Sequence, residues 1–86
     1  MKMITLRQAK VKYMNAPKAK NFTGLKLLTF KKDRFVAIIP KEDGLHLIES
    51  GYLNQDILLD AKEFKKQMKD AFNREFPRSS RLYLDE

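Results

Sequence analysis

The stretch LKLLTFKKDRFVAII, residues 25–39, holds two runs of β-forming residues on either side of a polar turn at 31–33. Two such runs joined by a short polar segment predict a β-hairpin. Apolar residues occupy both alternating sets of positions in each run, whereas a sheet with one face in water is apolar on one set only. We therefore expect the hairpin to be covered on both sides.

The chain after the hairpin continues with turns and short strands. Pro40 is expected to end the second strand, and the turn that follows contains Asp43 and Gly44, a pair that favours positive φ. Residues 45–49 predict a further strand, residues 50–51 a second turn, and residues 57–59 one more short strand.

The N-terminal segment shows alternation that changes phase. Ile4 and Leu6 alternate with polar neighbours, and Ala9, Val11 and Tyr13 do so in the opposite phase. This pattern predicts a strand with a β-bulge near residue 8, or two short strands. Residues 14–24 lack an apolar period and predict a basic loop.

The C-terminal part predicts one helix over about residues 60–75. Asp60 has the side chain of an N-cap, with Glu63 three residues later, and Pro77 disfavours helical geometry in the residue before it. An apolar stripe runs along the segment at spacings of three and four, through Ala61, Phe64, Met68, Ala71 and Phe72. Residues 82–84 predict a last strand or a docked tail.

These elements predict a single α+β domain over residues 1–86. We expect a strongly bent antiparallel sheet or a partly closed small barrel of about four to six strands, capped by the one C-terminal helix. One helix covers only one face of a sheet, so the second apolar face has to be buried by curling of the sheet or by a partner chain. A monomer and a homodimer both stay open.

The charge is strongly uneven along the chain. The net charge is +7, yet residues 1–41 hold eleven Lys and Arg against one acidic residue, while residues 42–86 hold seven against ten. A basic half of this kind attracts polyanions, because Lys and Arg neutralise phosphates. Lysines also serve as ordinary solvated surface, so the asymmetry permits both interpretations.

The leading hypothesis is a non-catalytic domain that binds RNA or single-stranded DNA, mainly through phosphates. The alternative is a protein-interaction or self-assembling module, whose apolar hairpin another chain covers and whose lysines only solubilise it. The basic strands and loops supply the candidate nucleic-acid-binding residues, with Phe22 expected to be exposed for stacking: Lys10, Lys12, Lys18, Lys20, Phe22, Lys26, Lys31, Lys32 and Arg34.

The sequence contains few residues or motifs that are typical of catalytic or metal-binding sites. His46 is the one histidine, there is no cysteine, and no glycine-rich nucleotide loop or nucleophile motif is present. We therefore expect no catalytic residue, metal site, cofactor or small-molecule substrate, and we interpret His46 as an ordinary strand histidine. The connector at 78–81, RSSR, is able to contact phosphates or to pair with the acidic half.

Location and family are also constrained. The N-terminus lacks the apolar core of a secretory signal, and the longest apolar run, residues 35–39, is far too short to cross a bilayer. With no cysteine for disulfides, we expect a cytoplasmic protein with no membrane partner. Residues 32–38 echo a strand of the RNA-recognition motif, but the glycine, the second aromatic and the element order of that motif are missing.

Overall fold

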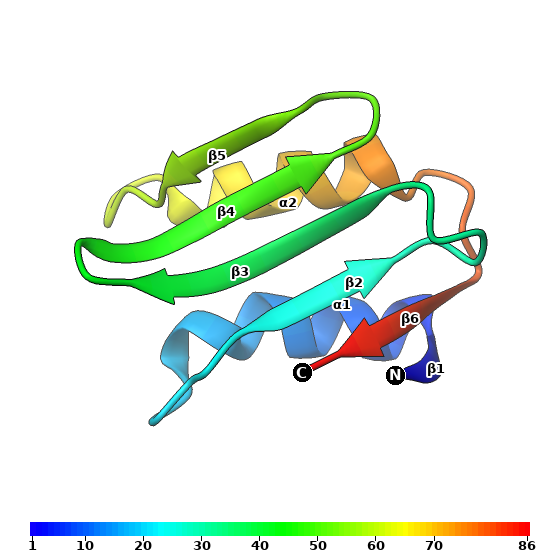
Figure 1. Ribbon diagram of the computed structural model, residues 1–86, viewed down its shortest axis with the longest axis horizontal. Coiled ribbons are helices and arrows are strands. Elements are labelled where there is room, and N and C mark those ends of the chain that lie inside the picture. Colours follow the sequence, from blue (N-terminus) through cyan, green and yellow to red (C-terminus); the bar gives the residue numbers. More distant parts are fainter.

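Six strands form one antiparallel sheet in the computed structural model, which describes all 86 residues. The strands are β1 (Lys2–Thr5), β2 (Leu25–Leu28), β3 (Phe35–Lys41), β4 (Gly44–Ser50), β5 (Gln55–Leu58) and β6 (Arg81–Asp85). The helices are α1 (Leu6–Asn15), the short 3-10 helix η1 (Ala16–Lys18) and α2 (Phe64–Glu75). The strand order β1-β6-β2-β3-β4-β5 places the C-terminal strand between β1 and β2 (Figure 1).

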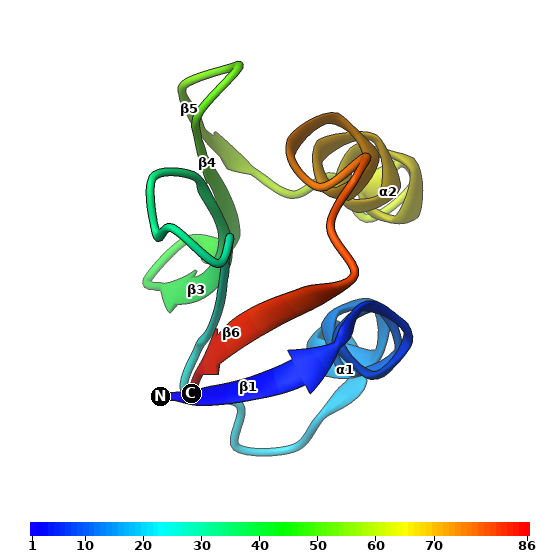
Figure 2. The ribbon, with the colours of Figure 1, turned by 90° about the vertical axis from the view of Figure 1, so that its right-hand side faces the viewer.

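Both long helices lie on the same side of the sheet (Figure 2). The hydrophobic core fills the space between, where buried strand residues such as Leu27, Ile38 and Leu47 meet the buried side chains of the helices. Tyr13 joins the two helices, because its ring lies 5.4 Å from that of Phe72 and its hydroxyl donates to a main-chain carbonyl of α2 over 2.7 Å. The paired aromatic rings add to the burial energy that holds this layer.

The prediction of strands through residues 9–13 is wrong, because α1 occupies this segment. Thr5 caps the helix: its hydroxyl accepts from the Gln8 N–H over 3.1 Å, and the Gln8 side chain accepts from the Thr5 N–H over 3.0 Å. Ala9 and Tyr13 share the buried helix face, whereas Val11, the middle residue of the apparent alternation, is 55% exposed. The four-residue spacing between Ala9 and Tyr13, which is typical of one face of a helix, was therefore the informative pattern.

The partly closed barrel and the single helix are also wrong. The sheet is open, with β1 and β5 as its two edges, and two helices cover one face. No second layer covers the other face, which we call the open face (Figure 2). Phe35 and Ile39, two of the hairpin residues that led us to expect cover on both sides, therefore stay half-exposed there.

The remaining strand and helix predictions hold with shifted bounds. The hairpin is confirmed as β2 and β3, and the later strands as β4, β5 and β6. Pro40 does not end β3, because it pairs with Leu45 at a point where β3 extends beyond β2 and needs no N–H on that side. The prediction of Asp60 as the N-cap is wrong, because helix α2 begins at Phe64. The Asp60 side chain instead accepts from the Lys62 N–H over 2.8 Å in the turn before the helix.

Candidate nucleic-acid interface

Aromatic side chains gather on the open face around β6, β2 and β3. The sheet register aligns Tyr83 with Leu28 and Leu28 with Phe35, so the two aromatic residues lie two strands apart in one row. Neighbouring strands are separated by about 4.8 Å, which places the two positions roughly 10 Å apart. Phe30, just after β2, lies nearly parallel to Tyr83 with 6.3 Å between ring centroids and is 69% exposed.

Cations accompany these rings. The Lys26 ammonium lies 4.2 Å from the centre of the Phe35 ring, and the Lys32 ammonium lies 4.8 Å from the centre of the Tyr83 ring. Such contacts hold a cation beside an aromatic surface without neutralising its charge. The open face therefore presents aromatic rings with lysine ammonium groups placed over two of them.

The β2–β3 turn fixes the backbone that carries the basic residues. The Thr29 hydroxyl donates to the Asp33 carboxylate over 2.7 Å, and this bond holds the pKa of Asp33 below its usual range. The Thr29 backbone N–H donates to the Arg34 carbonyl over 3.0 Å, and the Lys32 N–H donates to the Thr29 carbonyl over 2.8 Å. Lys32 itself adopts a left-handed φ of 60°. These hydrogen bonds therefore fix the backbone conformation of the turn that carries Lys31, Lys32 and Arg34.

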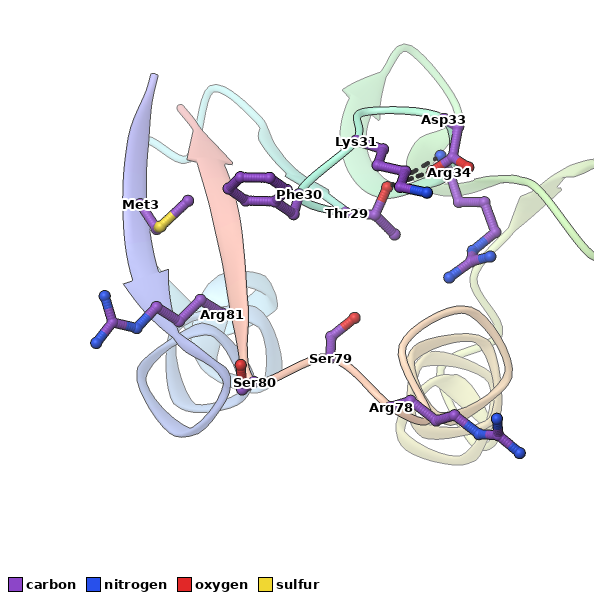
Figure 3. A pocket seen from close by; sticks show the side chains of 10 residues that line it. All are labelled: Met3, Thr29, Phe30, Lys31, Asp33, Arg34, Arg78, Ser79, Ser80 and Arg81. Atoms are coloured by element: carbon purple, nitrogen blue, oxygen red, sulfur yellow. Dashed lines mark hydrogen bonds between the residues drawn. The ribbon is translucent and has the colours of Figure 1, made fainter.

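A cleft of about 580 Å³ separates this turn from the connector between α2 and β6. Figure 3 shows the Arg34 guanidinium and the Ser79 hydroxyl directed into the space, with Phe30 at its rim. Arg78 and Arg81 stand at the two flanks, with their guanidinium groups turned outward (Figure 3). Lys31 is the fourth cation of the lining, against the single carboxylate of Asp33.

The predicted basic residues divide between two parts of the molecule. Lys26 projects from the open face and Lys31, Lys32 and Arg34 lie beside it, as described above. The other four are on the helix side: Lys10 and Lys12 in α1, Lys18 in η1 and Lys20 in the loop that follows. The fold therefore groups one half of the candidate set with the exposed aromatic residues and separates the other half from them.

The expectation that Phe22 is exposed is wrong. Its side chain is half-buried and packs against the hydrophobic core, because the loop after η1 folds back beside α1. The candidate set contained none of Phe30, Phe35 and Tyr83, the three aromatic residues that lie on or beside the open face. A signal for Tyr83 was present, because its position between Leu82 and Leu84 predicts a side chain on the opposite face from the two leucines.

His46 also lies on the open face, at the end remote from the aromatic row. Its Nε2 lies 2.7 Å from an Asp43 oxygen and its Nδ1 lies 2.7 Å from an Asp56 oxygen. The hydrogen bonds to Asp56 and Asp43 raise the pKa of His46 above its ordinary 6.5, and they lower the pKa of each aspartate. The Lys41 ammonium also contacts Asp56, over 3.0 Å.

We expect His46→Gln to destabilise the protein more at acidic than at alkaline pH. Because the pKa of His46 is raised in the folded protein, the stabilisation that it gives is fully present below pH 6.5 and is lost as the pH rises through the folded-state pKa. The lowered pKa of Asp56 gives stabilisation that is present above pH 3.8, and therefore at both of the pH values compared. Thermal unfolding at about pH 5.5 and about pH 8.5 measures this. A gap between wild type and variant that is equal at both pH values would contradict the ion-pair assignment.

A buried ion pair ties α2 to β4. Arg74 forms a two-point contact with Glu49, with distances of 2.7 Å from Nε and 2.8 Å from Nη2 to the two carboxylate oxygens. The Gln55 amide donates to the same carboxylate over 2.8 Å. Burial raises the pKa of Glu49, but the hydrogen bonds from Arg74, Glu75 and Gln55 outweigh it and hold that pKa below its usual value.

Glu75 uses the adjoining space to anchor the β4–β5 loop. Its carboxyl oxygens accept from the backbone N–H groups of Tyr52 and Leu53 over 3.0 and 3.1 Å. Burial and the hydrogen bond to Glu49 raise the pKa of Glu75. The Arg34 Nε lies 3.8 Å away, so this buried cluster also positions one side chain of the cleft.

Comparison with known proteins adds no relative. No family model, no curated protein and no solved structure matches this chain. Neither α1 nor α2 is long and apolar enough to serve as a membrane-crossing segment.

Proposed function

We propose that this protein is a non-catalytic domain that binds single-stranded RNA or DNA on its open face. The observation that carries the proposal is the set of exposed and half-exposed aromatic rings on an uncovered sheet face, two of them with a lysine ammonium within 5 Å. Domains that bind single strands combine these two features, since bases stack on aromatic side chains and phosphates contact cations.

The geometry favours an unpaired strand over a duplex. A base exposes its flat surface to a protein ring only when it is not stacked inside a double helix. Phe30 and Tyr83 together form one stacking surface, and Phe35 offers another two strands away. Two such surfaces roughly 10 Å apart suit bases of one short extended segment.

The charges at this end of the molecule are available to a ligand. Lys26, Lys31 and Lys32 form no ion pair within the protein, whereas several carboxylates have internal partners, such as Glu49 with Arg74 and Asp56 with His46 and Lys41. Unpaired lysines release counterions when they contact phosphates, which supplies affinity without reading sequence. The positive charge thus supports phosphate contacts beside the stacking surfaces.

The second candidate function is a protein-interaction or self-assembling module. The observation in its favour is the other half of the open face, where the exposed or half-exposed side chains of Ile39, Ile48 and Leu58 lie around His46 on β3, β4 and β5. A second copy of the chain is the simplest occupant of this surface, and it would give a dimer in solution. Association of this kind changes little with salt, unlike phosphate binding.

Charge reversal at the β2–β3 turn tests the leading proposal. We expect K31E/K32E to weaken binding of a single-stranded oligonucleotide at least tenfold and to reduce the log–log salt slope by roughly 1.4, since two phosphate contacts are lost. The matched control is K65E/K66E, the same charge change on exposed residues of α2. Fluorescence anisotropy at about 50 and about 200 mM salt measures both. Equal affinities for the two variants would contradict the placement of the interface.

A further inference from the structure

We infer that the cleft between the β2–β3 turn and the α2–β6 connector binds a terminal phosphate monoester of the nucleic-acid strand. The inference rests on the proposed function, because the rest of the strand would lie on the open face. It assigns the cleft a ligand class, and it gives the bound strand a fixed end.

The cleft has the size and the position that a terminal phosphate requires. Its volume of about 580 Å³ falls within the roughly 300–1,000 Å³ of small-ligand pockets, so it has room for a phosphate and its first sugar. Phe30 stands at the rim (Figure 3), and its ring centroid lies 6.3 Å from that of Tyr83. A phosphate in the cleft would therefore place the first base next to the stacking surface.

Arg34 is already held in place at the cleft. Its guanidinium carbon lies 4.6 Å from the centre of the Tyr52 ring, and its Nε lies 3.8 Å from Glu75. That Nε is buried and has no hydrogen-bond partner in the protein. The guanidinium is thus directed into the cleft (Figure 3) and forms no hydrogen bond within the protein. Pre-organised arginine of this kind suits the oxygens of a phosphate.

The connector between α2 and β6 supplies the other polar side chains of the cleft. Its backbone is anchored, because the Leu6 N–H donates to the Ser80 carbonyl over 2.9 Å. The Ser79 hydroxyl points into the cleft (Figure 3). Arg78 and Arg81 at the flanks are exposed and form no ion pair, so both are free to turn inward around an anion.

The charge balance favours a monoester over an internal diester. Four cations and one carboxylate line the cleft, and that carboxylate, Asp33, is already bonded to Thr29. A terminal phosphate carries close to two negative charges near neutral pH and offers three free oxygens. An internal diester carries one negative charge and has a sugar on each side, so it would contact fewer of the four cations that line the cleft.

The test compares oligonucleotides of one sequence that carry a 5′-phosphate, a 3′-phosphate or no terminal phosphate. We expect a phosphate at one of the two ends to tighten binding to the intact protein about tenfold, the effect of one or two charged hydrogen bonds. We expect R78Q/R81Q to remove that advantage. The control variant K65Q/K66Q, with the same loss of charge on exposed residues of α2, should keep it.

The outcomes separate the two proposals. Equal binding of all three oligonucleotides to the intact protein would overturn the cleft assignment and leave the proposed function in place. The cleft assignment would also be overturned if a 5′-phosphate and a 3′-phosphate tightened binding equally and R78Q/R81Q did not change this gain. Such a result would mean non-specific electrostatic attraction of the extra charge. If a nucleoside monophosphate competed as well as the phosphorylated oligonucleotide at the same concentration, the ligand of the cleft would be a small free nucleotide. That result would overturn the proposal that the cleft binds the end of a strand. No binding of any oligonucleotide would overturn the proposed function itself.

Discussion

Replacing Phe30 and Tyr83 together by alanine is expected to weaken single-strand binding by roughly ten- to a hundredfold. The two rings form one nearly parallel pair on the open face, and a base stacked on an aromatic side chain contributes about 1–3 kcal/mol by alanine substitution. The loss should be present at low and at moderate salt, because stacking depends weakly on screening. Fluorescence anisotropy titration of F30A/Y83A against wild type measures it.

The matched control keeps both rings. In F30Y/Y83F the aromatic surfaces remain and the hydroxyl group moves from one residue to the other, so affinity should stay within about twofold of wild type. Circular dichroism and thermal unfolding of each variant establish that it is folded. If F30A/Y83A binds as well as F30Y/Y83F, the open face is not the stacking surface.

Replacing Arg74 by methionine is expected to destabilise the fold strongly. Glu49 is 1% exposed and would lose the only cation that contacts its carboxylate. Removing one partner of a buried pair costs about 3–5 kcal/mol, and we expect about 2–3 kcal/mol because Arg74 is partly exposed. For a chain of this size that corresponds to a fall in Tm of roughly 10–20 °C, measured by thermal unfolding.

A second substitution shows whether the stranded charge is the cause. In E49Q/R74M the buried group is neutral, and we expect most of the lost stability to return. If R74M is as stable as wild type, the ion pair between α2 and β4 contributes nothing. If E49Q/R74M is no better than R74M, the loss comes from packing instead.

The sequence predicted the elements with strong local patterns. The hairpin at 25–39 was predictable from its two runs of β-forming residues, but the expected cover on both of its faces is absent from the chain, because both long helices lie on one side of the sheet. Helix α2 was predictable from its apolar spacing of three and four. Helix α1 was missed because Ala9, Val11 and Tyr13 alternate like a strand, although Thr5 and Gln8 already formed the pattern of a capping box.

Long-range arrangement was beyond local patterns. Nothing near residues 81–85 indicates that β6 pairs with both β1 and β2, and this pairing is what brings Tyr83 beside Phe30. The candidate site was predictable in its lysines near the hairpin turn, since a turn exposes polar side chains. Phe22 was misjudged because a polar neighbourhood in sequence does not prevent a ring from packing against the hydrophobic core.

The most direct test of nucleic-acid binding is a titration of the wild-type protein with labelled single- and double-stranded oligonucleotides at low and moderate salt. Light scattering in the same buffer gives the mass of the protein. We predict micromolar or tighter binding of the single strand, weaker binding of the duplex, and a log–log salt slope of several units. No binding at low salt, together with the mass of a dimer, would contradict the account and make the open face a contact between two copies of the chain.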